Sequence, residues 1–368
     1  MMRYVLPLLG ALTLWSAQAV AQIASSAGPV TVSPVLRGLD EPWGFGFLPS
    51  GEVVITERDG RVLLLRPGEG VEEVSGAPDV VSRGQGGLLD VLVPRDFDRT
   101  RELYFTYAKR QGLGGAGTAV AKARLRDDGR ALLDVETIFE AREGSSGGRH
   151  FGSRLVEARD GTLYLTIGDR GDRPSAQDLS NENGAVVRIA RDGSIPRGNP
   201  FADGGGQPGI WSYGHRNPQG MAMDADGNIW TVEHGAAGGD EINLIARGAN
   251  YGWPVISYGR HYSGARIGVG TEAAGMAQPE FYWDPSIAPS GMMIYSGALW
   301  PEWAGDIFVG SLKFDMISRL ERGSTVREAE RLESDETLRV RDIREAPDGS
   351  IWFLSVGQGA LYRMTPDG

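Results

Sequence analysis

Residues 160–166, Asp-Gly-Thr-Leu-Tyr-Leu-Thr, place a tight turn directly before a short, alternating apolar strand. Asp and Gly tolerate the positive φ that such turns need. The pattern recurs in six copies, at residues 49–56, 100–106, 159–166, 225–232, 304–309 and 347–354. Copies roughly 45 to 80 residues apart are too distant for hairpins of one sheet but fit one four-stranded blade each. The sequence therefore predicts an all-β, six-bladed β-propeller with four-stranded antiparallel blades.

The composition agrees with many short strands joined by tight turns, because the chain has 54 Gly, 20 Pro and nine Trp residues. A β-sandwich of unrelated hairpins is the alternative. The stretch 112–117, Gly-Leu-Gly-Gly-Ala-Gly, matches the dinucleotide-binding fingerprint, but residues 118–125 alternate like a strand where that fingerprint requires a helix. This stretch is therefore interpreted as a hairpin loop.

The first residues have the layout of a secretory signal peptide. A positive start at Arg3 precedes an apolar block over 4–15 and small residues through Ala21. We expect a signal peptide over 1–21 and one propeller domain over 22–368, exported across the inner membrane to the periplasm. A retained membrane anchor is the alternative, although no other stretch is apolar enough to span a bilayer.

Composition also excludes several functions. The absence of cysteine excludes disulfides, thiolate metal sites and cysteine nucleophiles. A net charge of -11, with no basic stripe, argues against a nucleic-acid partner. The four histidines are not paired at the spacing of a zinc-binding helix, which disfavours a zinc hydrolase.

Two polar loops carry candidate chemistry. His150 lies in the glycine-rich stretch 147–154, and a histidine there can act as a base near neutral pH. A loop histidine bonded to a carbonyl is the alternative. Arg216 and Asn217, in the polar cluster 211–220, place a guanidinium fork beside an amide, which suits quinone oxygens or carboxylates. A polar loop between blades would look the same.

Charged residues elsewhere indicate a metal and an anion. Asp240 and Glu241 follow a run of small residues, and carboxylates with exposed carbonyls are ligands for calcium, although the pattern is not an EF-hand. Arg339 and Arg341 alternate along a predicted strand, so both leave the same face. Two neighbouring guanidinium groups repel each other unless an anion, such as a multiply charged organic acid, lies between them. Two solvated surface arginines are the alternative. Lys313 is a further cation near a predicted strand end.

Long motifs carry a family resemblance. Residues 214–220, Gly-His-Arg-Asn-Pro-Gln-Gly, are accompanied by specific phrases at 39–44, 240–244 and 250–254. Over nearly all of the mature chain, the sequence resembles the soluble PQQ-dependent glucose and aldose sugar dehydrogenases of the glucose/sorbosone dehydrogenase family. The resemblance implies a propeller that oxidises aldose sugars at the anomeric carbon to lactones. A histidine base would remove the hydroxyl proton, and hydride would pass to a PQQ quinone polarised by calcium.

The resemblance also assigns roles to residues. His150 is the implied base, Asp169 orients it, and Arg216 with Asn217 reaches the quinone edge. The other implied PQQ contacts are Gln85, Tyr262, Lys313, Arg339 and Arg341.

The implied metal ligands are mostly main-chain oxygens. Those of Gly235 and Ala236 would hold the calcium of the cofactor, and Ala236 departs from the proline common in the family. The Glu241 carboxylate and the Tyr251 carbonyl would hold a second, structural calcium. Tyr282 and Trp283 are rim candidates for stacking on the sugar.

The extra loops of the glucose-specific branch have no clear counterparts here, which implies a monomer with broad aldose specificity. Its partners would be a small aldose and an electron acceptor of unknown identity. Two other functions stay open. One is a calcium-dependent propeller hydrolase, such as a lactonase, working through Asp240, Glu241 and His234. The other is a propeller that binds a ligand without catalysis.

Overall fold

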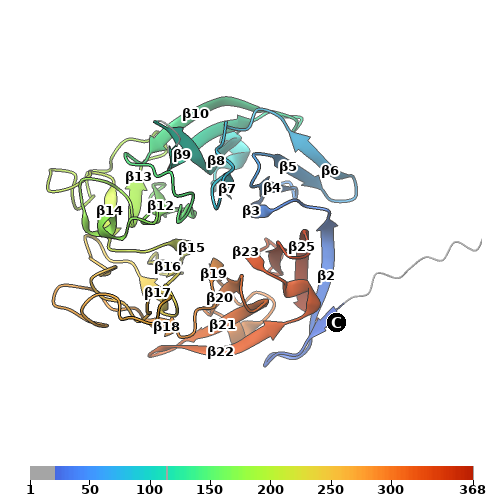
Figure 1. Cartoon of the computed structure of the whole chain (residues 1–368). Helices are drawn as coiled ribbons and strands as arrows, with labels where there is room; N and C mark the ends of the chain where they lie inside the picture. Colours follow the sequence, from blue (N-terminus) through green and yellow to red (C-terminus); the bar gives the residue numbers. More distant parts are fainter. Residues whose placement is uncertain (1–20, 113–114, 368) are drawn as a thin grey trace, which may run out of the picture.

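Six antiparallel sheets surround a central axis in the computed structural model, which describes residues 21–112 and 115–367 (Figure 1). Five sheets have four strands and the sixth has five. The six-bladed propeller is thus confirmed, and the β-sandwich alternative is wrong. The predicted signal peptide over 1–21 lies, apart from Ala21, outside the described residues.

The strands of each blade run outward from the axis. Blade one comprises β3 (Pro42–Phe47), β4 (Val53–Glu57), β5 (Val62–Arg66) and β6 (Gly70–Val74). Blade two comprises β7 (Leu88–Leu92), β8 (Glu102–Gln111), β9 (Gly115–Leu125) and β10 (Leu132–Glu140). Blade three comprises β11 (Leu155–Glu157), β12 (Leu163–Ile167), β13 (Ala185–Ile189) and β14 (Ile210–Tyr213). Blades four and five comprise β15 (Pro218–Met223), β16 (Ile229–Glu233), β17 (Asp240–Leu244) and β18 (Phe281–Trp283), then β19 (Pro289–Ile294), β20 (Ile307–Ser311), β21 (Met316–Arg322) and β22 (Val326–Glu333). Blade six comprises β23 (Val340–Glu345), β24 (Ile351–Ser355), β25 (Ala360–Pro366), β2 (Val30–Arg37) and β1 (Ala21–Ile23).

Every copy of the recurring sequence pattern forms the second strand of its blade, namely β4, β8, β12, β16, β20 or β24. In β12 all five residues are buried, because neighbouring blades cover both faces of the sheet. The turn before it has the expected chemistry: the amide of Thr162 donates to Asp160 Oδ1 at 3.0 Å, and Gly161 has a φ of +82°. Each repeat therefore specifies one blade.

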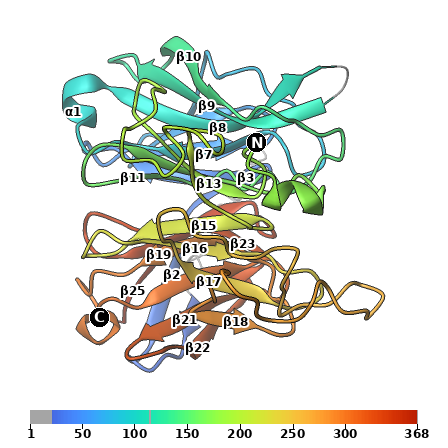
Figure 2. The same ribbon diagram turned by 90° about the vertical axis from the view of Figure 1, so that its left-hand side faces the viewer.

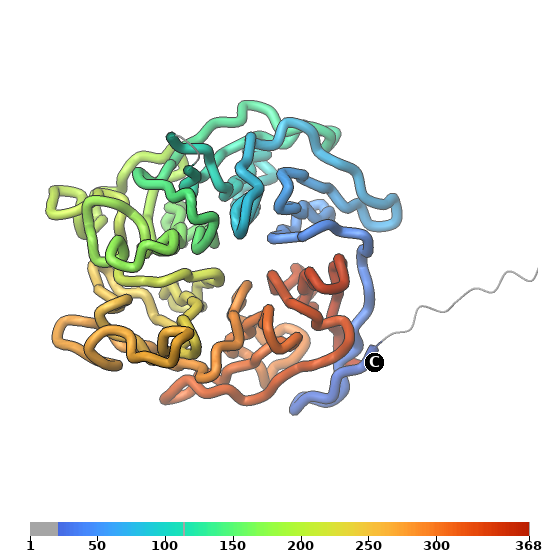
Figure 3. Tube along the Cα trace, in the orientation of Figure 1, coloured from blue at the N-terminus to red at the C-terminus, as the bar shows by residue number. Residues whose placement is uncertain are grey.

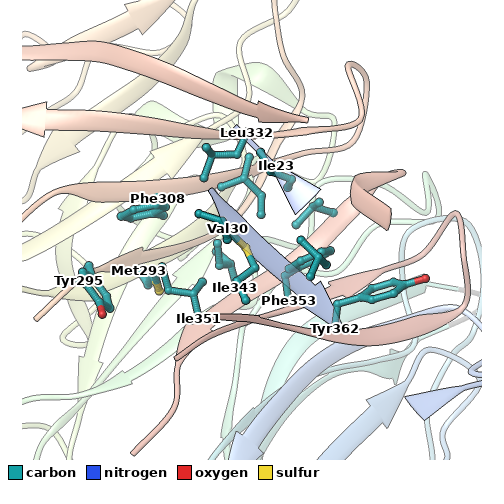
Figure 4. Packing of buried hydrophobic residues seen from close by; sticks show 14 of the residues in the cluster. Ile23, Val30, Met293, Tyr295, Phe308, Leu332, Ile343, Ile351, Phe353 and Tyr362 are labelled. Atoms are coloured by element: carbon teal, nitrogen blue, oxygen red, sulfur yellow. The ribbon is translucent and has the colours of Figure 1, made fainter. Parts of the chain in front are cut away.

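The ring is closed by the N-terminal segment. β2 pairs antiparallel with β25, with Val30 opposite Pro366, so the first and last described parts of the chain lie side by side (Figure 3). Ile23 and Val30 pack into the same buried cluster as Phe353 and Tyr362 (Figure 4). This closure was not foreseen from the sequence.

The described helices are short: α1 (Phe97–Thr100) and the 3-10 helices η1 (Arg173–Gln177), η2 (Pro301–Trp303) and η3 (Asp335–Thr337). Within residues 21–112 and 115–367, no helix has the length and apolarity to cross a membrane. The fingerprint-like stretch 112–117 lies where β8 is followed by β9, and Gln111 of β8 pairs with Gly115 of β9. A strand follows it, as predicted, instead of a nucleotide-binding helix.

The six innermost strands contact one another around the axis. Because consecutive strands are antiparallel, the beginning of each innermost strand and the end of each second strand lie on one face of the propeller. In the side view the loop between β17 and β18 projects from one side of the molecule (Figure 2).

Candidate active site

A cavity of about 240 Å³ lies where the innermost strands begin. Its polar lining includes Glu41, Arg58, Gln85, Asn217, Gln219, His234, Arg339 and Arg341, with Trp43, Leu89, Phe151 and Leu312 as apolar walls. Four residues predicted from separate parts of the sequence, Gln85, Asn217, Arg339 and Arg341, therefore share one cavity.

Arg339 and Arg341 reach the cavity by a route that differs from the prediction. β23 begins at Val340, and Arg339 precedes it with a φ of +51°. The pairing of β23 with β24 is irregular between Val340 and Asp342. The two arginines do not simply alternate along a strand, but both line the cavity.

Neither guanidinium is neutralised by a carboxylate in the cavity. Arg339 Nη1 donates to the Leu312 carbonyl at 2.9 Å, and Arg341 Nη1 donates to Gln219 Oε1 at 3.0 Å. Burial, followed by the charges of Arg154, Arg339 and Arg58, lowers the pKa of Arg341 to about 9. Because the neighbouring positive charges lower the pKa of Arg341, the cluster favours an anionic ligand.

His150 forms a tight pair with Asp169. The ring Nδ1 lies 2.6 Å from Asp169 Oδ1, and Asp169 is fully buried while the histidine side chain is 13% exposed. The other carboxylate oxygen accepts from Trp253 Nε1 at 2.8 Å, and Oδ1 also accepts from the Gly171 amide at 2.7 Å. Asp169 thus orients the ring and directs Nε2 away from itself.

The pKa values of the pair suit a base. Burial lowers the pKa of His150, the hydrogen bond that its ring donates to Asp169 raises it in part, and the charge of Arg216 lowers it further. Burial alone would raise the pKa of Asp169, but the hydrogen bonds from His150, Gly171 and Trp253 hold it below its ordinary value. At neutral pH the carboxylate is charged and the imidazole is neutral.

The backbone of His150 is held in a strained conformation beside the cavity. Its φ is +53°, and its amide donates to Gln85 Oε1 at 2.7 Å. A Cβ at Gly168 would lie 2.3 Å from the His150 carbonyl oxygen, so only glycine fits there. Gln85 therefore positions the histidine as well as lining the cavity, a role that the sequence did not reveal.

Arg216 lines a smaller cavity and is not among the lining residues of the larger one. The side chain is 8% exposed, its Nη1 donates to the His234 carbonyl at 3.2 Å, and its Nε is buried with no partner among the described residues. The guanidinium stands over the Trp253 ring at 5.3 Å. Asn217 Oδ1 accepts from the Gly152 amide at 3.2 Å.

The smaller cavity has an interior of about 10 Å³, which is room for one ion or water molecule. It brings together three of the predicted calcium ligands, Gly235, Glu241 and Tyr251, whereas Ala236 is not among its lining residues. Burial raises the pKa of Glu241 well above its usual range, and the nearby carboxylates of Glu233 and Asp240 add to this effect. A cation would relieve the crowding of negative charge.

Within the part of the chain that the structure describes, no three His, Asp or Glu side chains gather into a metal site. A calcium ion would therefore need main-chain oxygens, as the resemblance implies. Asp240 is fully buried and accepts from the Gly235, Ile287 and Ala288 amides and from Ser286 Oγ. This carboxylate supports the loop, and the hydrolase alternative loses one of its working residues.

Seven predicted site residues line neither cavity, namely His150, Asp169, Ala236, Tyr262, Lys313, Tyr282 and Trp283. Lys313 is exposed and its Nζ donates to the Ser286 carbonyl at 3.1 Å. Tyr262 is 79% exposed. Tyr282 is 44% exposed and stacks on Tyr258 with ring centroids 4.1 Å apart.

The structure corrects the prediction of Trp283 as a rim residue that stacks on the sugar. It is 4% exposed, packs in a hydrophobic cluster, and donates from Nε1 to Glu328 at 3.0 Å. Because β18 alternates, Tyr282 points outward and Trp283 points into the blade. Trp283 is therefore removed from the substrate candidates.

A third cavity, of about 320 Å³, lies at the other end of the innermost strands. Between the two ends, Arg154 pairs with Asp90 at 3.0 Å and Asp342 at 2.8 Å, and Arg344 pairs with the same carboxylates at 2.5 and 2.9 Å. We call these four residues the axial ion-pair cluster. Arg154 also stands over Trp43, a wall of the first cavity, at 4.6 Å. The cluster forms the floor beneath the candidate site.

The fold and the site define a six-bladed β-propeller with a cationic axial cavity flanked by a His–Asp pair. The family model described as Glucose / Sorbosone dehydrogenase matches residues 39–363, and the chain belongs to this family. The resemblance seen in the motifs is thereby confirmed, as is the prediction of a dehydrogenase.

Similar proteins support the assignment. The aldose sugar dehydrogenase YliI of Escherichia coli (strain K12) is 43% identical over 350 residues, which cover 92% of this chain and 94% of that protein. The apo-form crystal structure of the soluble aldose sugar dehydrogenase from Escherichia coli has a TM-score of 0.89 at 41% identity, covering 92% of this chain and 100% of that one. Quinoprotein glucose dehydrogenase B of Acinetobacter calcoaceticus is 29% identical over 76% of this chain and 63% of its own length.

Proposed function

We propose that the protein oxidises aldose sugars at the anomeric carbon to lactones, with PQQ as the bound oxidant and calcium as its metal. The observation that carries the proposal is the cavity in which Arg339 and Arg341 lack carboxylate partners, beside the His150–Asp169 pair. The names of the aldose sugar dehydrogenase and the quinoprotein relatives point to the same substrate and cofactor class.

The residues fit such a group. PQQ carries three carboxylates, and the cavity lining offers Arg339 and Arg341 without carboxylate partners, whereas Arg58 is paired with Glu41. Two buried polar atoms nearby, Arg216 Nε and His234 Nε2, have no partner among the described residues. A buried polar atom without a partner is costly, so a polar ligand is the expected complement.

When bound, PQQ would supply a quinone that accepts two electrons from the sugar, made more electrophilic by calcium. Side chains of the protein supply the base and the groups that bind the cofactor. His150 takes the proton of the anomeric hydroxyl, and Asp169 holds the hydrogen on Nδ1 so that Nε2 is the accepting atom. Arg216 and Asn217 bind the quinone edge, while Arg339 and Arg341 bind carboxylates.

Calcium would be held by main-chain oxygens of Gly235 and Ala236. A second ion would be held by Glu241 and the Tyr251 carbonyl, where the small cavity and the raised pKa of Glu241 favour a cation. Removal of either ion would leave buried negative or dipolar groups without a partner.

The remaining proposals concern the setting of the enzyme. A leader over 1–21 would direct it to the periplasm, leaving 22–368 as one catalytic domain. It would work as a monomer, with Tyr262 and Tyr282 at an open rim that tolerates several aldoses, and would pass electrons to an unidentified acceptor.

The test uses the purified chain loaded with PQQ and calcium, an aldose and a redox dye. Dye reduction that requires PQQ, calcium and sugar together is expected, and His150→Ala should lower turnover about 100-fold or more while PQQ still binds. Absence of dye reduction with several aldoses, despite stoichiometric PQQ, contradicts the proposal. Lactone hydrolysis without PQQ, abolished by a chelator, would favour a hydrolase instead.

A further inference from the structure

Arg170 is a buried cation that the proposed function does not use. It directly follows Asp169 and is 1% exposed. Burial lowers the pKa of Arg170 to about 10, so the guanidinium still carries its charge at neutral pH. Its Nη1 and Nη2 donate to carbonyl oxygens, and its Nε has no partner among the described residues. Burial of a cation on carbonyl groups alone is costly, which indicates a role that an apolar side chain could not perform.

The guanidinium of Arg170 contacts the chain on both sides of His150. Nη1 donates to the carbonyl of Arg149, the residue before the histidine. The same guanidinium stands over the ring of Phe151, the residue after it, 3.3 Å from the ring centroid. Nη2 donates to the Ala116 carbonyl at 3.1 Å, which ties this loop to β9 of blade two. A single side chain therefore holds both neighbours of His150 against a neighbouring blade.

The peptide unit before His150 is held at both of its polar groups. The carbonyl of Arg149 and the amide of His150 belong to this one planar unit. Arg170 donates to the carbonyl, and Gln85 Oε1 accepts from the amide at 2.7 Å. The φ of His150 measures rotation about the bond that leaves this plane, so fixing the plane fixes the backbone that carries the imidazole.

The conformation of His150 requires such a restraint. Its φ of +53° lies in the left-handed region, which a residue with a side chain keeps only when its surroundings enforce it. Asp169 meanwhile binds the ring, with Oδ1 2.6 Å from Nδ1. Two adjacent residues that follow β12 thus hold the two parts of the histidine: Asp169 the ring and Arg170 the backbone.

We propose that Arg170 is a positioning residue for the base: it fixes the peptide unit before His150 and so keeps the imidazole where it takes the proton of the sugar. The inference rests on the proposed function and deepens it. Arg170 lines neither cavity of the site, so it acts through His150 and touches neither cofactor nor sugar. A planar fork can donate to two carbonyls while its face covers an aromatic ring, and lysine cannot.

The experiment compares wild type with Arg170→Lys and Arg170→Met. The lysine keeps the charge without the fork, and the methionine keeps only an apolar stem. Arg319→Met is the matched control, because Arg319 is also buried and pairs with Asp306 and Glu330, but lines neither cavity of the site. Its loss should lower Tm without moving the base.

Two kinds of measurement are made. The PQQ- and calcium-loaded proteins give kcat and KM for an aldose, and a fluorescence titration gives the PQQ dissociation constant. The second measurement needs no cofactor: in the apoprotein the Nδ1 proton of His150 resonates far downfield because of its short hydrogen bond to Asp169. The loss of this NMR signal in His150→Ala assigns it, and His215, whose Nδ1 lies 2.8 Å from Glu233, is the internal reference.

Both Arg170 variants should lose about 10- to 100-fold in kcat, with KM and PQQ affinity within about threefold of wild type, because a misplacement of about 1 Å has an effect of this size. The His150 signal should move upfield or broaden while the His215 signal stays. The Arg319 variant should keep kcat within about twofold and keep both signals. The lysine variant decides the outcome if the methionine variant does not fold.

Three results overturn the inference. One is a kcat within about twofold of wild type in the Arg170 variants, whatever their Tm. Another is an unchanged His150 signal. The third is a loss of PQQ affinity that parallels the loss of kcat, because Arg170 would then support the cofactor cavity instead of the base. Wild-type protein without dye reduction contradicts the proposed function, and the His150 signal in the apoprotein then still tests whether Arg170 positions the histidine.

Discussion

Replacement of Asp169 by Asn tests the His–Asp pair most directly. Three donors converge on this carboxylate: His150 Nδ1 at 2.6 Å, Gly171 N at 2.7 Å and Trp253 Nε1 at 2.8 Å. An amide has one accepting oxygen, so at least one buried donor faces an NH₂ group. Leaving one buried donor unpaired costs about 1 to 3 kcal/mol of stability.

The same substitution changes the base. Asp169 raises the pKa of His150, against burial, which lowers it. Loss of the carboxylate charge therefore lowers the His150 pKa further, and the acid limb of the pH–rate profile should move to lower pH. Turnover should fall about 100-fold or more, because the imidazole becomes a weaker and less well oriented base.

The assay is dye reduction by the PQQ-loaded enzyme from pH 4 to 8, with His150 followed by NMR among the four histidines of the chain. Asp172→Asn, at an exposed position three residues away, is the matched control and should leave both the rate and the profile unchanged. An acid limb that moves to higher pH in the Asp169 variant, or a rate within about twofold of wild type, would refute the reasoning.

Three further changes separate anchoring, metal binding and folding. Arg341→Met should lower PQQ affinity about 100-fold in a fluorescence titration, whereas His150→Ala should bind PQQ normally and lose turnover; identical behaviour of both variants would contradict the division of roles. A calcium chelator should lower Tm in the wild type, and Glu241→Gln should reduce that chelator effect, as differential scanning calorimetry can show. Asp342→Ala should cost about 3 to 5 kcal/mol in urea unfolding because it breaks the buried axial ion-pair cluster, while Glu136→Ala, which removes an exposed pair with Lys122, should cost at most about 1 kcal/mol.

The architecture was predictable because each blade repeats one local signal. The Asp-Gly turn and alternating strand need only neighbouring residues to form, and all six copies became second strands. The ring closure was not predictable in this way. Val30 and Pro366 become partners through a pairing that no local pattern records. Trp283 was misplaced for a related reason, since the register of β18 decides which of two adjacent aromatic residues is buried.

The site was predicted in part. Gln85, Asn217, Arg339 and Arg341 share the cavity, but Arg58 and His234 were missing from the predicted cofactor contacts. A positional signal was available, because both lie just beyond the second strand of their blades, as Asp169 does. Antiparallel pairing carries that position to the face where the innermost strands begin. The unpaired state of Nε2 in His234, by contrast, depends on three-dimensional packing alone.

The pairing of β2 with β25, which closes the ring, has low resistance to force in one direction. Val30 at the N-terminal end of β2 lies opposite Pro366 at the C-terminal end of β25, so tension applied at these two points would act along the hydrogen bonds, perpendicular to the strands. Hydrogen bonds loaded in this way break one after another and not all at once. A fusion or surface tether that pulls on both ends should therefore open the propeller at modest force, whereas attachment at one end leaves this pairing unloaded.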